Sequence, residues 1–319
     1  MTEKETPASS NDDETTRAQT TTEALEWHAP VMVRIDEHTT IPHLLKERVQ
    51  RGATRPLILR KVGIGDTWRS ITAREFYDEV HALAAGLIAR GLELGDRVAI
   101  MSRTRYEWTL LDFACWAAGL VPVPIYETSS IDQVAHVLVD ADVTLIITET
   151  VSMAEIVRAA AERENRDNTH VLSLDSEAIE TLIAEGSTTP RERVLARSEA
   201  LTKDDIATIV YTSGTTGTPK GTVLSHENFT NLCVNAHAWM PEIAAGKNSR
   251  LLLFLPLAHV FARFLQVFQI SGNGVLGHAP NIKNLLPDLA SFKPSYLLVV
   301  PRVLEKIYNS EDTKARGPK

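Results

Sequence analysis

Short apolar segments alternate with segments of helical periodicity along most of this chain, and that alternation limits the fold more than any other feature. Apolar residues recur at helical spacing from Phe76 to Ile88, and Gly91 follows this run. Beyond it, the sequence predicts strands at 97–101, 121–125, 143–147 and 170–174, separated by helices at 106–118, 132–140 and 152–164. Strands and helices in this order predict an α/β fold with largely parallel sheets and helices on both faces.

The same alternation resumes after a polar stretch at 185–205, which we interpret as a connection between two subdomains. The second series has predicted strands at 206–212, 250–255, 274–277 and 296–300, and predicted helices at 226–239, 260–270 and 282–291. A chain of 319 residues is long enough for two such units. We therefore expect a first α/β subdomain at 25–203 and a second at 204–319.

Residues 1–24 precede the first subdomain and are rich in Thr, Ser, Asp and Glu. They include six acidic and two basic residues and almost no apolar side chains. Such a segment cannot bury enough apolar surface to offset the entropy lost on ordering. We therefore expect a disordered acidic tail at 1–24.

The overall charge and the cysteine usage exclude several classes of protein. The chain has 33 Lys and Arg against 41 Asp and Glu, a formal net charge of −8, whereas a general nucleic-acid binder needs a basic surface. Its two cysteines, Cys115 and Cys233, form no Cys-x-x-Cys pair, and this usage is typical of a reduced, cytoplasmic protein. No run approaches the roughly 18 apolar residues of a membrane-spanning helix. Peripheral contact with a membrane stays open, although no strongly basic amphipathic helix supports it.

The segment 206–221 concentrates residues that are suited to binding phosphate. A run rich in β-branched residues leads into a loop of hydroxyl side chains and glycines that ends near Lys220. The glycines allow the backbone to turn tightly, so successive N–H groups can form an anion-binding nest, and the lysine adds a positive charge on a flexible stem. The Walker A pattern does not fit, because Pro219 stands where its second glycine is required and Gly221 where its hydroxyl residue is required.

These residues carry a resemblance to a known family. The loop Tyr211-Thr-Ser-Gly-Thr-Thr-Gly-Thr-Pro-Lys-Gly221 resembles the signature loop of the AMP-forming acyl- and aryl-CoA synthetases, also called adenylate-forming enzymes. The segment Leu255-Pro-Leu-Ala-His-Val-Phe261 is similar to the next motif of that family, whose proline and histidine flank the nucleotide and acyl pockets. Segments 95–102, 124–130 and 301–308 resemble long-chain fatty acyl-CoA synthetases in particular.

The resemblance implies the large N-terminal domain of the adenylate-forming enzymes, an α/β domain with two β-sheet subdomains flanked by helices. Members of the family are nearly twice as long and continue with further nucleotide-binding motifs and a small C-terminal domain. None of these motifs occurs before Lys319. We therefore expect the second subdomain to be incomplete at the C-terminus, the small domain to be absent, and the isolated chain to be inactive or weakly active.

The implied activity is that of a long-chain fatty acid–CoA ligase, which converts ATP, a fatty acid and coenzyme A into acyl-CoA, AMP and pyrophosphate through an acyl-adenylate. By the same resemblance, Lys220 and His259 are candidate catalytic residues. Mg²⁺ is the implied metal, and Thr212 is a candidate ligand for it. The candidate nucleotide-binding residues are Thr212, Ser213, Gly214, Thr215, Thr216, Gly217, Thr218 and Lys220.

Other interpretations of the same residues stay open. A different adenylate-forming ligase, acting on an acyl carrier protein or on aryl acids, would carry the same loop, and so would an inactive remnant that only binds a nucleotide. His259 also has a purely structural interpretation, since a lone histidine in an apolar stretch is often a core or helix-cap residue. The sequence leaves the oligomeric state and the preferred acyl chain length undetermined.

Overall fold

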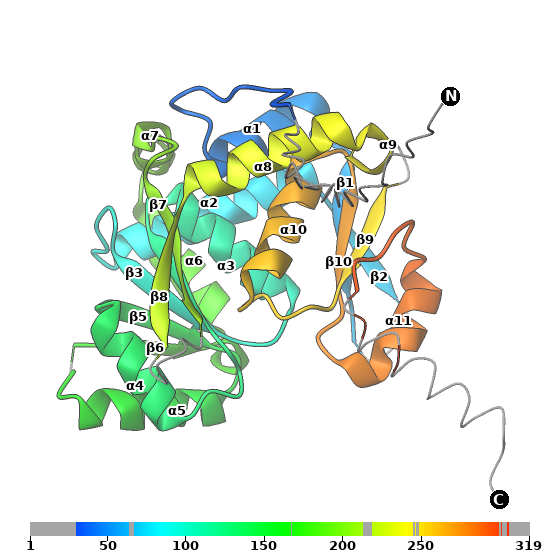
Figure 1. Cartoon of the computed structure of the whole chain (residues 1–319). Coiled ribbons are helices and arrows are strands. Elements are labelled where there is room, and N and C mark those ends of the chain that lie inside the picture. The colour runs from blue at the N-terminus through cyan, green and yellow to red at the C-terminus, as the bar shows by residue number, and fades with distance from the viewer. Residues whose placement is uncertain are drawn as a thin grey trace, which may run out of the picture. The chain divides into compact units, whose positions relative to one another are not determined.

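A computed structural model describes residues 30–63, 67–166, 168–212, 219–244, 246, 249–299, 301 and 305. The chain divides after Val31, and every helix and strand named below belongs to the unit that begins at Met32 (Figure 1). The predicted acidic tail at 1–24 lies outside the described residues. No helix in the described part of the chain is both long and apolar enough to span a bilayer.

The helices occupy most of the segments that helical periodicity predicts. Capping boxes begin three of these helices, formed by Thr72 with Glu75 in α2, by Ser130 with Gln133 in α4 and by Ser225 with Asn228 in α8. The α-helices are α1 (Ile41–Gly52), α2 (Ala73–Ala89), α3 (Tyr106–Ala117), α4 (Ile131–Asp140), α5 (Val151–Arg163), α6 (Ala178–Glu185), α7 (Arg191–Ala200), α8 (His226–Trp239), α9 (Pro241–Ala244), α10 (Val260–Ser271) and α11 (Leu285–Phe292). Short 3₁₀ turns lie at η1 (Leu174–Ser176), η2 (Gly186–Thr188) and η3 (Ile282–Asn284).

A four-stranded parallel sheet has the order β4 (Val121–Ile125), β3 (Arg97–Met101), β5 (Val143–Thr148) and β6 (His170–Ser173). Alternate residues of β3 enter different cores. Val98 and Ile100 join the core that contains α2 and α3, whereas Ala99 and Met101 join the core that contains α4 and α5. Figure 1 shows these two pairs of helices on opposite sides of the sheet. The prediction of a parallel sheet with helices on both faces is therefore confirmed here, and burial of both faces explains why the residues of β4 are apolar throughout.

A second four-stranded sheet is mixed. Its order is β2 (Trp68–Thr72), β1 (Pro56–Lys61), β10 (Val275–His278) and β9 (Arg250–Leu253), and only β2 runs antiparallel to its neighbour. Strands from both predicted subdomains thus share this sheet, because β1 pairs directly with β10. The subdomain limits 25–203 and 204–319 stay a prediction.

Three further features differ from the sequence-based expectations. The predicted connection at 185–205 contains α7, a polar helix that buries Val194 and Arg197 and therefore lacks a clear apolar period. The predicted strand at 296–300 is absent over 296–299, where Tyr296 forms only an isolated bridge to Leu251. The unexpected strand β8 (Lys220–Ser225) pairs antiparallel with β7 (Ile206–Thr212), although its mostly polar or exposed residues give little sequence signal.

Candidate functional site

The β7–β8 hairpin carries the predicted phosphate-binding loop at its tip. Thr212 at the end of β7 lies opposite Lys220 at the start of β8, and both side chains are exposed. Two strands that face each other in this way fix both ends of the connecting loop. The candidate residues Ser213, Gly214, Thr215, Thr216, Gly217 and Thr218 lie outside the described residues.

In the described part of the chain, two side-chain hydrogen bonds connect the hairpin to α4. The hydroxyl of Tyr211 donates to Oδ2 of Asp140 at 2.6 Å, and Nε2 of His136 lies 2.8 Å from the carbonyl oxygen of Pro219. Because a carbonyl oxygen only accepts, His136 donates this bond and carries a proton on Nε2. Partial burial, together with the hydrogen bond to Asp140, raises the pKa of Tyr211, which therefore stays a donor. These contacts position the hairpin, and no spacing in the sequence predicts them.

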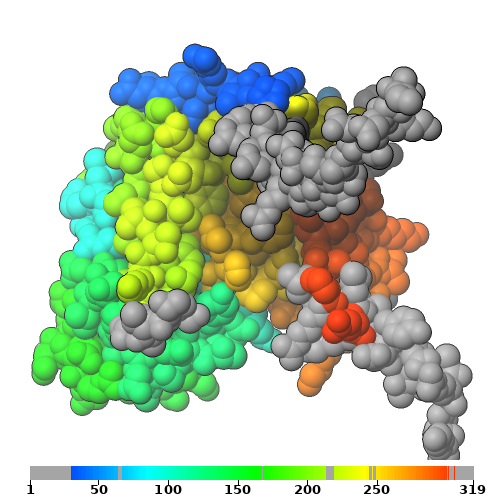
Figure 2. Space-filling model, in the orientation of Figure 1, coloured from blue at the N-terminus to red at the C-terminus, as the bar shows by residue number. Residues whose placement is uncertain are grey.

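A cavity of about 420 Å³ lies between the hairpin, the end of β4 and the start of α10. Figure 2 shows the surface of the hairpin (yellow-green) beside that of α10 (orange), above the green surface of the α4–α5 region. The lining includes Ile125, Tyr126, Gln133, Thr212, Pro219 and His259. The structure thus brings the candidates Thr212 and His259 to one cavity, and Lys220 directly follows its lining residue Pro219. A ligand site at the carboxyl end of a parallel strand such as β4 is common in α/β folds.

His259 is the N-cap residue of α10, so its structural interpretation as a helix cap is confirmed. Its Nδ1 accepts a long hydrogen bond of 3.4 Å from the backbone N–H of Phe261. In neutral His259 the proton therefore lies on Nε2, as a donor on an exposed ring at the edge of the cavity. The N-terminus of α10 adds a partial positive charge at the same place, because its first backbone N–H groups lack helical partners.

A fully buried ion pair anchors α10 beneath this cavity. Arg263 donates from Nε and Nη2 to the carboxylate of Asp112 on α3, at 3.1 and 2.7 Å, and from Nη1 to the hydroxyl of Thr208 on β7. Burial raises the pKa of Asp112, although hydrogen bonds from Arg263 and Gln266 act against that rise. Arg263 thus connects α3 to β7 and α10, and the latter two elements line the cavity. Sequence reasoning missed it, although an arginine within an apolar helical face was a signal.

The donor groups at the cavity suit a metal ion only if a ligand supplies further oxygens. Within the described ranges, no group of three or more His, Cys, Asp or Glu side chains is placed to hold a metal. The side chains lining the cavity include the hydroxyls of Ser129 and Thr212 and no carboxylate. This set fits Mg²⁺ that is held mainly by phosphate oxygens and water, which is the usual binding mode of that ion.

Comparison with known proteins agrees with the predicted resemblance. The sequence profile of the family described as AMP-binding enzyme matches residues 45–318. The long-chain-fatty-acid–CoA ligase FadD15 of Mycobacterium bovis is 39% identical over 292 residues, which cover 91% of this chain and 48% of that protein. The long-chain-fatty-acid–CoA ligase ACSBG2 of Rattus norvegicus is 30% identical over 314 residues, covering 88% of this chain and 45% of that protein. The chain thus spans about half the length of these relatives.

Solved structures share the fold. A fatty acyl-CoA synthetase of Mycobacterium tuberculosis matches with a TM-score of 0.69 at 24% identity, covering 85% of this chain and 51% of the other. The crystal structure of VinN matches with a TM-score of 0.70 at 18% identity, covering 89% of this chain and 67% of the other. At these identities the likeness concerns the fold alone.

Proposed function

We propose that this chain, which belongs to the family of AMP-binding enzymes, carries the phosphate-binding part of a long-chain fatty acid–CoA ligase site. The observation that carries the proposal is the convergence of Thr212, Pro219 and His259 on one cavity at the tip of the β7–β8 hairpin. The 39% identity to a relative named as such a ligase supports the choice of substrate class.

The proposed reaction has two steps. A fatty acid carboxylate attacks the α-phosphorus of ATP, forming acyl-AMP as the bond to pyrophosphate breaks. The thiol of coenzyme A then attacks the acyl carbon, forming acyl-CoA as AMP leaves. Negative charge builds up on the leaving pyrophosphate in the first step, so fixed hydrogen-bond donors and a cation at the phosphates lower its barrier.

The residues of this chain fit that first step. In the proposal, Thr212, Ser213, Gly214, Thr215, Thr216, Gly217 and Thr218 supply hydroxyl and backbone N–H donors to the phosphates. Lys220, fixed at the start of β8, supplies a positive charge beside the loop. His259 donates from Nε2 at the edge of the cavity. Mg²⁺, when bound, neutralises phosphate oxygens, and Thr212 is the residue we propose to contribute a hydroxyl to it.

The direct test measures binding of Mg²⁺–ATP to the 319-residue chain by calorimetry. We expect saturable binding that Lys220→Ala weakens by tenfold or more, because removal of a charge beside phosphate loses a charge-assisted hydrogen bond. Lys46→Ala is a matched control, since the side chain of Lys46 is also exposed but contacts Glu199 and does not line the cavity at the hairpin. Equal affinities of all three proteins would contradict the assigned role of Lys220.

A substrate panel tests the reaction. With palmitate, a short-chain acid and an aryl acid, we expect acid-dependent exchange of pyrophosphate into ATP to be greatest with palmitate. A preference for the aryl acid would favour an aryl-CoA ligase, and transfer to an acyl carrier protein in place of coenzyme A would favour a carrier-protein ligase. Because we expect the isolated chain to be inactive or weakly active, exchange at a rate normal for such ligases would exclude both an inactive fragment and a nucleotide-binding remnant. A cytoplasmic location and peripheral membrane contact stay predictions.

A further inference from the structure

A second polar cavity, of about 270 Å³, lies apart from the hairpin and is not used in the proposed reaction. Its lining residues follow or end four strands of the two large sheets. Arg60 lies near the end of β1 and His278 ends β10, Arg103 and Arg105 follow β3, and Glu149 follows β5. In α/β folds, ligands commonly bind at the carboxyl ends of parallel strands, which is where these residues lie in both sheets.

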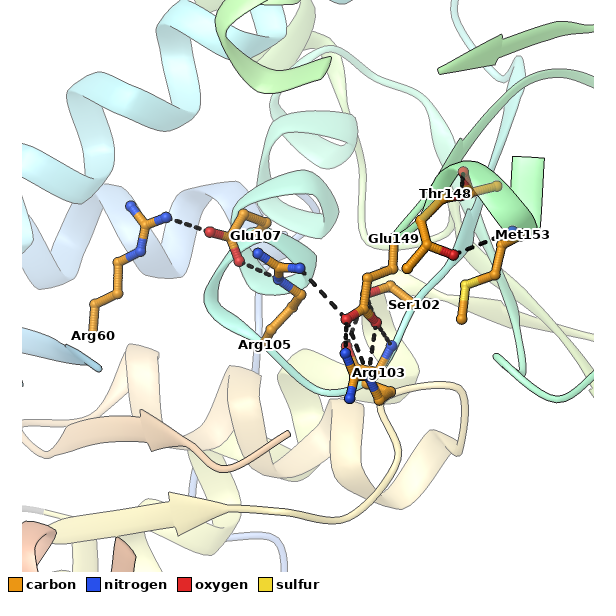
Figure 3. Close-up of polar contacts among 9 residues, drawn as sticks. Arg60, Ser102, Arg103, Arg105, Glu107, Thr148, Glu149 and Met153 are labelled. Carbon is orange, nitrogen blue, oxygen red and sulfur yellow. Dashed lines mark hydrogen bonds and ion pairs between the residues drawn. The ribbon is translucent and has the colours of Figure 1, made fainter. Parts of the chain in front are cut away.

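Two buried carboxylates hold the arginines of this cavity in place (Figure 3). Glu149, whose side chain is only 3% exposed, accepts from the backbone N–H of Arg103 at 2.8 Å and from its guanidinium Nε and Nη2. Glu107 accepts from Nε of Arg105 at 2.6 Å and from Nη2 of Arg60, and Nη1 of Arg105 reaches Glu149 at 3.5 Å. Positive and negative groups therefore alternate along the row that Figure 3 displays.

These contacts keep both carboxylates ionised. Burial alone would raise the pKa of Glu149, but the hydrogen bonds from Arg103 outweigh burial and lower it below its ordinary value. For Glu107 the hydrogen bond and charge of Arg105 likewise outweigh burial, and the pKa is lowered. Each guanidinium is thus held by at least one fixed negative charge, and that of Arg105 by two, which restricts its rotation and pre-organises its remaining N–H groups.

The remaining N–H groups have no assigned partner. Among the described residues, Nη1 of Arg103, Nη2 of Arg105 and Nη1 of Arg60 make no hydrogen bond. Three arginines face two glutamates at this cavity, so positive charge is in excess. Guanidinium groups in this arrangement are well suited to the oxygens of a phosphate or carboxylate.

His278 adds an acceptor to the same cavity, and the surrounding hydrogen bonds determine its tautomer. Gln266 donates from Nε2 to Asp112 at 2.6 Å, so its Oε1 accepts the hydroxyl proton of Thr109 at 2.8 Å. The hydroxyl oxygen of Thr109, 2.7 Å from Nε2 of His278, must then accept from that nitrogen. Burial lowers the pKa of His278 to about 4, so the neutral ring presents Nδ1 as a bare lone pair.

Nδ1 of His278 has no hydrogen-bond partner in the described part of the chain, although the residue is only 5% exposed. A buried acceptor without a donor is unfavourable, so a ligand that donates an O–H group to this atom would be stabilised. The arginines beside it favour the binding of negatively charged oxygens. One small ligand class combines both features, an oxyanion that retains a proton near neutral pH.

We propose that this cavity is a second anion site, which binds a monoprotonated phosphate group. Its charged oxygens accept from the free N–H groups of Arg60, Arg103 and Arg105, and its O–H donates to Nδ1 of His278. The site is independent of the proposed ligase activity, because its residues are distinct from those at the hairpin cavity.

The test titrates the ¹⁵N-labelled 319-residue chain with inorganic phosphate at neutral pH and follows the histidine ring nitrogens. We expect a saturable shift of Nδ1 of His278 as it begins to accept a hydrogen bond, while Nε2 stays protonated. Sulfate has the same shape but carries no proton at this pH. We therefore expect sulfate to bind at least about fivefold more weakly than phosphate. No saturable response of His278, or equal binding of both anions, would overturn the proposal.

Substitutions locate the site. We expect Arg103→Gln to weaken phosphate binding about tenfold, whereas Arg163→Gln should leave it unchanged, since Arg163 is a similarly exposed arginine that pairs with Asp132 elsewhere. Arg60→Gln is a second variant, which leaves the contacts of Glu149 intact if Arg103→Gln prevents folding. Lys220→Ala should leave the response of His278 intact. Loss of that response in Lys220→Ala, or normal binding by Arg60→Gln and Arg103→Gln, would overturn the assignment.

Discussion

Arg263 and Asp112 face each other from α10 and α3 with no exposed surface on either side chain, and Nη2 of the arginine lies 2.7 Å from Oδ1 of the carboxylate. Trp116 covers the guanidinium, whose central carbon lies 5.4 Å from the centre of the aromatic ring. Because His259 caps the N-terminus of α10, the contacts of Arg263 with Asp112 and with Thr208 determine where the histidine lies relative to β7.

Removal of one member of this pair should strongly destabilise the chain. We expect Arg263→Met to lower the free energy of unfolding by about 3–5 kcal/mol, because Asp112 would stay buried without a counter-charge. Urea denaturation measures the change. Adding Asp112→Leu to the same chain should recover part of the loss, and Arg163→Met, which breaks an exposed pair, should have little effect. A double variant less stable than Arg263→Met would contradict this account.

The packing of α2 against α6 leaves no room for a side chain at Gly86. A Cβ atom added there would lie 1.9 Å from the carbonyl oxygen of Leu182. Helix propensity alone predicts that Gly86→Ala stabilises the chain by up to about 1 kcal/mol. We expect the opposite sign, a loss of about 1–3 kcal/mol, because the two backbones must move apart. Thermal unfolding distinguishes the two expectations, because the melting temperature of Gly86→Ala would rise in the first case and fall in the second.

Buried His226 should make the chain sensitive to acid. Its Nδ1 accepts from the backbone N–H of Ile41 at 3.3 Å, and burial lowers its pKa to about 4 although Asp205 acts against that shift. An unfolded chain would protonate this histidine near pH 6.5 and therefore binds more protons between pH 6.5 and 4. The free energy of unfolding should fall through that window as the pH is lowered, by on the order of 3 kcal/mol for this group.

The variant His226→Gln tests this origin of the acid sensitivity. Glutamine retains a hydrogen-bond acceptor but does not titrate, so the slope of the free energy of unfolding against pH should decrease between pH 4 and 6.5. Part of the slope should remain, because burial also lowers the pKa of His81 and His278 to about 4. An unchanged slope in His226→Gln would show that this histidine does not contribute.

The contact between Tyr211 and Asp140 should matter more for ligand binding than for stability. Tyr211→Phe removes one partly exposed hydrogen bond, so we expect the free energy of unfolding to fall by about 1 kcal/mol or less. Within the described residues, the hairpin would lose one of its two side-chain hydrogen bonds with α4, and we expect the affinity for Mg²⁺–ATP to fall severalfold. Calorimetry measures the affinity, and an unchanged value would argue against a positioning role for this contact.

The elements with strong apolar runs could be predicted closely from the sequence. Strands β3 and β4 and helix α8 begin and end at the predicted residues, 97–101, 121–125 and 226–239. Strand β8 and helix α7 could not be predicted in the same way, because their residues are largely polar or exposed and contacts with other elements hold them in place.

The candidate site was predictable only in part. The loop motif pointed to Thr212 and the motif at 255–261 pointed to His259, and the two residues do line one cavity. Both predictions came from resemblance and not from any period in the sequence. The anchors His136 and Asp140 and the cluster around Glu149 depend on pairs of residues far apart in the chain. Such pairs become visible only once the strand order is known.

The pairing of β1 with β10 has a consequence for biosynthesis. Ile58 of β1 pairs with Leu276 of β10. The hairpin of β1 and β2 therefore emerges from the ribosome long before β10, the strand that pairs with the other edge of β1. During that interval a nascent chain presents the unpaired edge of β1, which holds the apolar residues Leu57 and Ile58. Exposed edges of this kind invite pairing between chains. Slow synthesis should therefore increase the need of this protein for chaperones that shield nascent chains.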